Sequence, residues 1–63
     1  MALVKLSKVN ESGEDVGTVF INTDQIVAVI IGHRATEIQM VDGRPRWVKQ
    51  TPEEVVALAK ASV

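Results

Sequence analysis

The residues best suited to acid–base chemistry are few and widely spaced. The chain has one histidine, His33, with Asp24 and Glu37 as the nearest acidic residues on either side. A histidine and a carboxylate can form an acid–base pair. However, no serine or cysteine nucleophile stands in a recognisable setting, and no glycine-rich phosphate loop follows a strand. We interpret His33 as a solvated turn residue and expect no catalytic residues and no enzymatic activity.

Metal and cofactor chemistry is equally poorly represented. Cysteine is absent, and a single histidine makes a structural zinc site implausible. The paired carboxylates Glu53 and Glu54 follow Thr51-Pro52, which is typical of the first turn of a helix. We expect no metal and no cofactor.

A basic cluster with one aromatic residue is the best candidate binding surface. It consists of Arg34, Arg44, Arg46, Trp47 and Lys49, in a segment from residue 33 to 49 with net charge +2, while the rest of the chain carries −3. Guanidinium groups beside an outward tryptophan can bind single-stranded nucleic acid or a protein. Alternatively, Arg44 and Arg46 pair with Glu37 and cross-strand neighbours. The net charge of −1 favours this second interpretation, because proteins that bind nucleic acid usually carry an overall basic charge.

The size of the chain constrains how these residues can be positioned. Sixty-three residues form one domain, and a core of that size rarely supplies more than ~3–5 kcal/mol. Without disulfides or zinc, oligomerisation remains as the means of stabilisation. Only Phe20 and Trp47 are aromatic, so the core must be aliphatic.

Periodicity predicts a small α+β domain. Five strands, at about 2–9, 17–22, 26–32, 35–41 and 46–50, are expected to form a strongly bent antiparallel sheet or partly open barrel. The polar segment from Asn10 to Asp15 predicts a mobile loop, and Thr23 to Ile26 predicts one helical turn. A single C-terminal helix is predicted at 52–61, packed across one face or opening of the sheet.

The helix has clear start signals. Thr51 is an N-cap, Pro52 occupies the first helical position, and Glu54 has the capping-box spacing from Thr51. Helical spacing predicts an apolar stripe facing the sheet, which comprises Val55, Leu58, Ala59 and Ser62 with Val56 beside it.

Asp42-Gly43 predicts a hairpin with two alternative registers. A two-residue loop places Trp47 opposite Ile38 and stacks it on the core. A three-residue loop with a bulge at Gly43 instead puts Val48 beside Ile38 and turns Trp47 outward. We favour the second register, because Val48 is flanked by polar residues. Pro45 suggests an edge position or a bulge.

The run from Ile26 to Ile31 is apolar on both faces and β-branched at five of its six positions. A strand of this kind requires burial on both faces, yet one helix can cover only one face of a small sheet. Either the sheet curls into a barrel or a second subunit covers the outer face. The candidate oligomer interface is Val27, Val29 and Ile31.

Several short motifs together resemble the small flagellar FlbD/SwrD-type proteins. They lie at 4–6, 20–26, 36–43, 48–49 and 51–55: Val4-Lys5-Leu6, Phe20-Ile21-Asn22 with Asp24 and Ile26, Thr36, Ile38, Met40 and Asp42-Gly43, Val48-Lys49, and Thr51-Pro52-Glu53-Glu54-Val55. This chain departs from the family in its longer loop from Glu11 to Gly17. The resemblance implies a similar small fold and a non-enzymatic accessory role, and it transfers no catalytic residue.

Two functions follow as expectations. The first is a small interaction or regulatory module that forms a homo-oligomer and binds an as yet unidentified protein. The alternative is a nucleic-acid-binding oligomer that uses Arg34, Arg44, Arg46 and Lys49 with Trp47. The N-terminal residues lack a signal-peptide layout, and no apolar run approaches the ~20 residues of a membrane span. We therefore expect a soluble cytoplasmic protein without membrane insertion.

Overall fold

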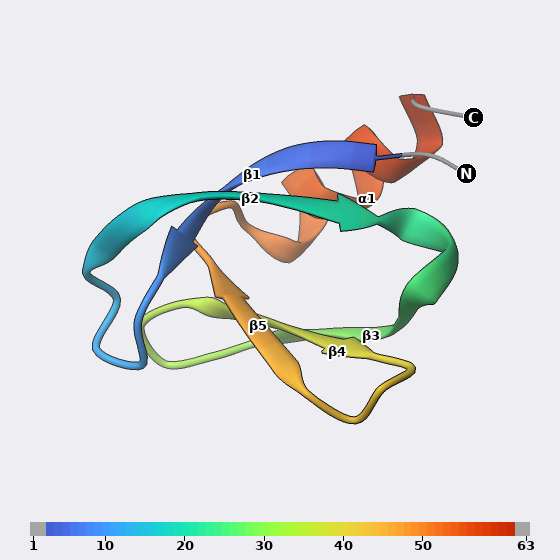
Figure 1. Ribbon diagram of the computed structural model, residues 1–63. Helices are drawn as coiled ribbons and strands as arrows, with labels where there is room; N and C mark the ends of the chain where they lie inside the picture. The colour runs from blue at the N-terminus through green and yellow to red at the C-terminus, as the bar shows by residue number, and fades with distance from the viewer. Residues whose placement is uncertain (1–2, 62–63) are drawn as a thin grey trace.

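The computed structural model describes residues 3–61 as one sheet with one helix (Figure 1). Ala2, at the predicted start of the first strand, and Ser62, in the predicted helical stripe, lie outside the described residues. The α+β prediction is confirmed. The elements are β1 (Leu3–Val9), β2 (Asp15–Asn22), the 3-10 turn η1 (Thr23–Gln25), β3 (Ile26–Ile31), β4 (Thr36–Met40), β5 (Pro45–Val48) and α1 (Pro52–Ala61).

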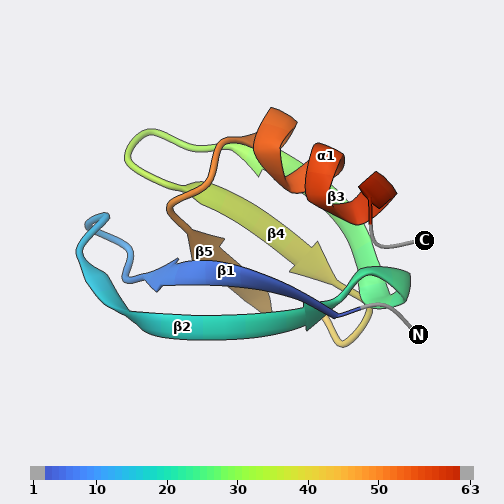
Figure 2. The same cartoon turned by 90° about the horizontal axis from the view of Figure 1, so that it is seen from above.

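The five strands are antiparallel and lie in the order β2-β1-β5-β4-β3. The sheet bends strongly between β1 and β5, so that β1 and β2 form one layer above β3, β4 and β5 (Figure 1). Helix α1 lies over β3 (Figure 2). The sheet remains open, with β2 at one end of the strand order and β3 at the other.

The aliphatic core lies inside this bend. The strand β1 alternates as predicted, with Val4 and Leu6 buried and Lys5 exposed. In the paired strand β2, Ile21 is buried and faces Val4, while Phe20 points outward. The core unites both layers and the helix, with side chains of Val4, Leu6, Ile21, Ile38, Val48 and Val55.

The first loop is shorter and more closely bonded than predicted. The strand β2 begins at Asp15 rather than Gly17. Asn10 explains this difference, because its side-chain Oδ1 accepts hydrogen bonds from the backbone N–H groups of Ser12 (2.9 Å) and Glu14 (3.0 Å). An asparagine that bonds the backbone two and four residues ahead closes the turn locally.

The β4–β5 hairpin adopts the favoured, three-residue register. Gly43 has φ 81° and donates its N–H to the carbonyl of Met40 at 3.0 Å. Val48 consequently faces Thr36, with both side chains buried, and Trp47 faces Glu37 on the outer side of the sheet. Pro45 is the first residue of β5, the position in a strand that a residue without an N–H can occupy.

The helix starts as predicted but buries less than predicted. The Thr51 Oγ1 accepts from the Glu54 N–H at 3.2 Å, and the Glu54 Oε1 accepts from the Thr51 N–H at 3.1 Å, which completes a capping box. Val55 is the one fully buried residue of α1 within the described chain. The prediction that Leu58 is buried against the sheet is wrong, because its side chain remains 40% exposed.

No helix within residues 3–61 has the length and apolar character needed to cross a membrane.

Candidate interaction site

The edge strand β3 exposes several large aliphatic side chains. It pairs with β4 alone and stands at the end of the strand order. Val27 is 64% exposed and Ile31 is 77% exposed, while Val29 is half-buried against the core. The sequence predicted that this strand needs burial on both faces, and within residues 3–61 that burial is incomplete.

A register shift between Ile26 and Ala28 explains why Val27 is so exposed. Ile26 faces Met40 and Ala28 faces Gln39, so Val27 is an extra residue without its own partner on β4. Such a bulge turns one side chain away from the regular pleat. From Ala28 to Ile31 the pairing with β4 is regular.

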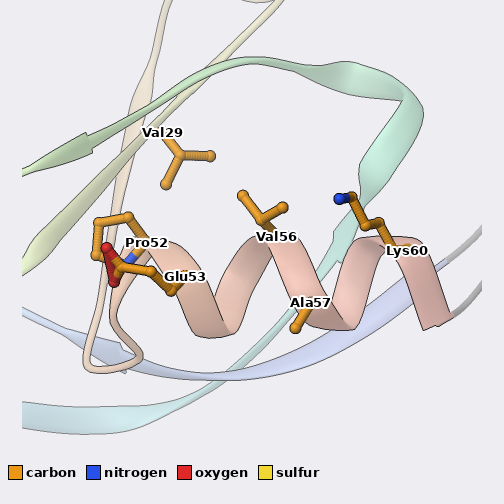
Figure 3. A pocket seen from close by; sticks show the side chains of 6 residues that line it. All are labelled: Val29, Pro52, Glu53, Val56, Ala57 and Lys60. Atoms are coloured by element: carbon orange, nitrogen blue, oxygen red, sulfur yellow. The ribbon is translucent and has the colours of Figure 1, made fainter.

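An apolar groove separates α1 from β3 (Figure 3). It consists of two adjoining hollows of about 430 and 310 Å³ that share Val29, Val56 and Lys60. Val56 points from the helix toward Val29, with Pro52 at one end and Lys60 at the other (Figure 3). We call this feature the α1–β3 groove. Its lining is mostly apolar, and Glu53 and Lys60 carry its charges.

The groove residues of α1 were missed as candidate site residues in the sequence. Val56 lies next to the predicted apolar stripe and lines the groove at 43% exposure, whereas its neighbour Val55 is buried. The signal in the sequence was that Val56 is an additional apolar residue beside a stripe that already has enough apolar residues to cover the sheet. Such a residue is a candidate for an exposed binding surface.

The basic cluster does not form one surface. Arg46 faces Ile38, while its neighbour Trp47 faces Glu37. Because successive side chains of a strand point to opposite faces, Arg46 and Trp47 lie on opposite faces of β5. Trp47 is partly buried rather than fully exposed.

Arg46 is held by its own hairpin. Its Nη2 lies 3.1 Å from Asp42 Oδ2, and its Nη1 donates to the Arg44 carbonyl at 2.6 Å. The partner is therefore Asp42, and the expected pairing of Arg46 with Glu37 is wrong. The Glu37 Oε2 instead accepts from Gln39 Nε2 at 3.2 Å.

The Asp42 carboxyl is the titratable group most affected by this arrangement. The Arg44 backbone N–H donates to Asp42 Oδ1 at 2.8 Å. That hydrogen bond first, and the Arg46 guanidinium second, lower the pKa of Asp42 below its ordinary value of 3.8. Both contacts stabilise the charged carboxylate.

The other two basic residues lie in separate loops. Arg34 is exposed in the loop between β3 and β4, next to Gly13 of the loop between β1 and β2. Lys49 is exposed after β5, and its backbone N–H donates to the Ser7 carbonyl at 2.9 Å.

The candidate acid–base residues Asp24 and His33 are also far apart. Asp24 precedes β3 and His33 follows it, so the six residues of β3 separate them by roughly 20 Å at the usual rise of a strand. Within residues 3–61, no three His, Cys, Asp or Glu side chains gather to form a potential metal site.

Comparison of the chain with models of protein families, with curated protein sequences and with solved structures gives no match.

Proposed function

We propose that this protein is a non-enzymatic interaction module that acts in the cytoplasm through homo-oligomerisation and protein binding. The observation that carries this proposal is the apolar, uncharged edge strand β3 bordering the α1–β3 groove. Exposed edge strands of this composition are unusual in monomers, because they offer a template for pairing with another chain.

The composition of the remaining surface supports the same proposal. Large hydrophobic side chains are exposed on both layers of this small domain, including Phe20 on β2 and Ile31 on β3. Among these, Val27, Ile30 and Ile31 all belong to the single strand β3, and exposed apolar residues gathered on one element favour an interaction site over scattered ones. The resemblance to flagellar accessory proteins also fits a role without catalysis.

Sedimentation equilibrium across the micromolar range tests the oligomer. We expect the unmodified protein to associate and the Ile31→Lys variant to be a monomer, because a lysine on this edge must lose water when a second chain covers it. Val41→Lys is the matched control. Val41 is 60% exposed at the hairpin tip, and its N–H donates to the Gln25 carbonyl just before β3. Ile31 lies at the opposite end of β3, so the Val41→Lys variant should associate normally.

A monomeric unmodified protein at all these concentrations would contradict the proposal. Equal association of the Ile31→Lys and Val41→Lys variants would show that the oligomer uses a surface other than β3, and would also contradict it.

Nucleic-acid binding by the basic cluster is the alternative function. The separation of Arg46 from Trp47 and the Arg46–Asp42 ion pair weaken it. Titration with single-stranded polyanions at low salt, followed by Trp47 fluorescence, tests this alternative. We expect no binding, whereas affinity that falls steeply with salt would favour the nucleic-acid function.

A further inference from the structure

We propose that the occupant of the β3 edge is β3 of a second copy, paired antiparallel about a two-fold axis on which Ile30 faces Ile30 of that copy. This inference rests on the proposed function and specifies its geometry. The result is one continuous ten-stranded sheet made from two copies of the five-stranded sheet.

The two open edges of the sheet differ in their suitability for pairing. The strand β3 has the sequence IVAVII, without charge, proline or glycine. The strand β2 carries Asp15 and Gly17 and begins next to a register shift in its pairing with β1. Charged side chains and bulges discourage edge pairing. The available edge is therefore β3.

The β3–β4 hydrogen bonds show which backbone groups lie on the open side. Val41 donates its N–H to the Gln25 carbonyl at 2.9 Å, so the backbone groups of Val41 face the β3 side. Backbone groups alternate sides along a strand. Gln39 and Glu37, two and four residues earlier, therefore also direct their N–H and C=O groups toward β3.

The partners of these two residues follow from the register. Ala28 faces Gln39 and Ile30 faces Glu37, so Ala28 and Ile30 use their backbone groups within the sheet. By the same alternation, Val29 and Ile31 direct their N–H and C=O groups to the open edge. These two residues can bond a sixth strand added beside β3.

Two-fold symmetry restricts the register. In an isologous antiparallel pair, one residue must lie opposite its own copy. Residues that lie opposite each other point to the same face of the sheet, whereas successive residues of one strand point to opposite faces. Symmetry therefore excludes a register in which two successive residues lie opposite each other in the two copies. Centring on Ala28 or Val29 would involve the bulge at Val27, and centring on Ile31 would leave little strand beyond it. Centring on Ile30 pairs Val29 with Ile31 of the second copy, and Ile31 with Val29.

The side chains agree with this register on both faces. Val29 lies at the α1–β3 groove, so Ile31 of the second copy would cover the mouth of the groove and lose its own 77% exposure. On the outer face, Ile30, which is 41% exposed, would meet its own copy. Each contact is between two aliphatic side chains.

The charges at the two ends of β3 favour the antiparallel direction. Asp24 stands before the strand, and Arg34 stands after it. Antiparallel pairing brings the acidic end of one copy toward the basic end of the other at both ends of the interface. A parallel pair would bring like charges together, which opposes association.

Cysteine cross-linking tests the register, and the chain contains no cysteine to interfere. Residues that face each other in an antiparallel pair without mutual hydrogen bonds are about 4.5 Å apart at Cα, which lies within the range for a disulfide. We expect the Ile30→Cys variant to form a disulfide-linked dimer at least about tenfold faster than chance collision. Phe20→Cys is the control, since Phe20 is more exposed, at 62%, but lies on β2.

The outcomes separate this inference from the proposed function. Fast cross-linking of Ile30→Cys alone supports the inference. Equal rates for both variants, in a protein that sediments as an oligomer dependent on Ile31, would overturn the register while leaving the proposed function intact. A monomeric protein without preferential cross-linking would overturn both.

Discussion

Glu37 lies directly across from Trp47 in the β4–β5 pair, on the outer face of the sheet. Ile30 faces Glu37 from the other side, so the three side chains form one row across β3, β4 and β5. The tryptophan is therefore part of the sheet surface and is separated from the Arg46 guanidinium by the sheet itself. This arrangement removes the main reason for assigning the basic hairpin to nucleic acid.

The Asp42–Arg46 ion pair leads to a prediction about the pKa of Asp42. Replacing Arg46 with Met should raise the pKa of Asp42 only part of the way to 3.8, because the Arg44 N–H hydrogen bond is the larger cause and remains. Carboxyl-carbon chemical shifts of Asp42 recorded against pH measure this change. A return all the way to 3.8 would contradict the assigned order of causes.

The same pair affects stability at low pH. The folded pKa of Asp42 is lowered, so the folded state binds fewer protons than the unfolded state at acidic pH. The stability contributed by this carboxylate is complete above the unfolded value of 3.8 and is lost as the pH falls through the lower, folded value. In urea unfolding, the Asp42→Asn variant should have a lower free energy of unfolding than the unmodified protein at neutral pH. The two free energies should converge in strong acid, where the carboxylate is protonated.

Two glycines with almost the same backbone conformation offer a matched test of the loop contact. Gly13 has φ 87° and Gly43 has φ 81°. Gly43→Ala should destabilise the fold by about 1–2 kcal/mol through backbone strain alone, since no atom lies within 4 Å of the added Cβ. Gly13→Ala should cost more, because its Cβ would lie 2.9 Å from the Arg34 carbonyl oxygen. Equal losses of stability for the two variants in thermal unfolding would mean that the Gly13 loop moves away from the Arg34 loop at little cost.

The capping box predicts coupled losses of stability. Thr51→Ala should lower the free energy of unfolding by about 1 kcal/mol. Thr51 and Glu54 hydrogen-bond reciprocally, so the double substitution with Glu54→Ala should cost less than the sum of the two single ones. Glu53→Gln, in the same first turn, serves as the control for helix charge. Strict additivity in urea unfolding would contradict the reciprocal bonds.

Core packing predicts a steep dependence on Ile38, which is fully buried. Ile38→Val should cost about 0.5–1.5 kcal/mol and Ile38→Ala about 2–5 kcal/mol. The second loss is comparable with the ~3–5 kcal/mol that such a small core supplies, so Ile38→Ala should be largely unfolded. Val41→Ala, at an exposed position, should stay within about 0.5 kcal/mol of the unmodified protein by circular dichroism.

Local sequence patterns predicted the elements of this fold well. The alternation of Val4 and Leu6, the break at Asn22, the Gly43 bulge and the Thr51 cap all depend on neighbouring residues. Such interactions are visible in sequence because the groups that make them are only a few residues apart.

The position of β3 in the sheet was not predicted, because strand order depends on contacts between distant residues. An apolar run is equally compatible with a buried central strand and with an edge that a second chain covers. The bulge at Val27 and the side-by-side placement of β3 and Val56 also arise only from the tertiary arrangement. For the candidate site, Val27, Val29 and Ile31 were chosen from the sequence, whereas Ile30 and Val56 required the structure.

The junction between β1 and β5 has a consequence for the order in which the protein folds. Lys8 faces Val48, and the Ser7 N–H donates to Gln50 Oε1 at 3.0 Å across 43 residues of chain. Closing a loop of that length costs about 2 kcal/mol more in entropy than closing a short hairpin turn. The two halves of the sheet can therefore form early and separately, and during synthesis they can join only after Gln50 has emerged. Until then the apolar inner faces of both halves stay open to water, so the synthesis of Val48 and Gln50 determines when the core can close.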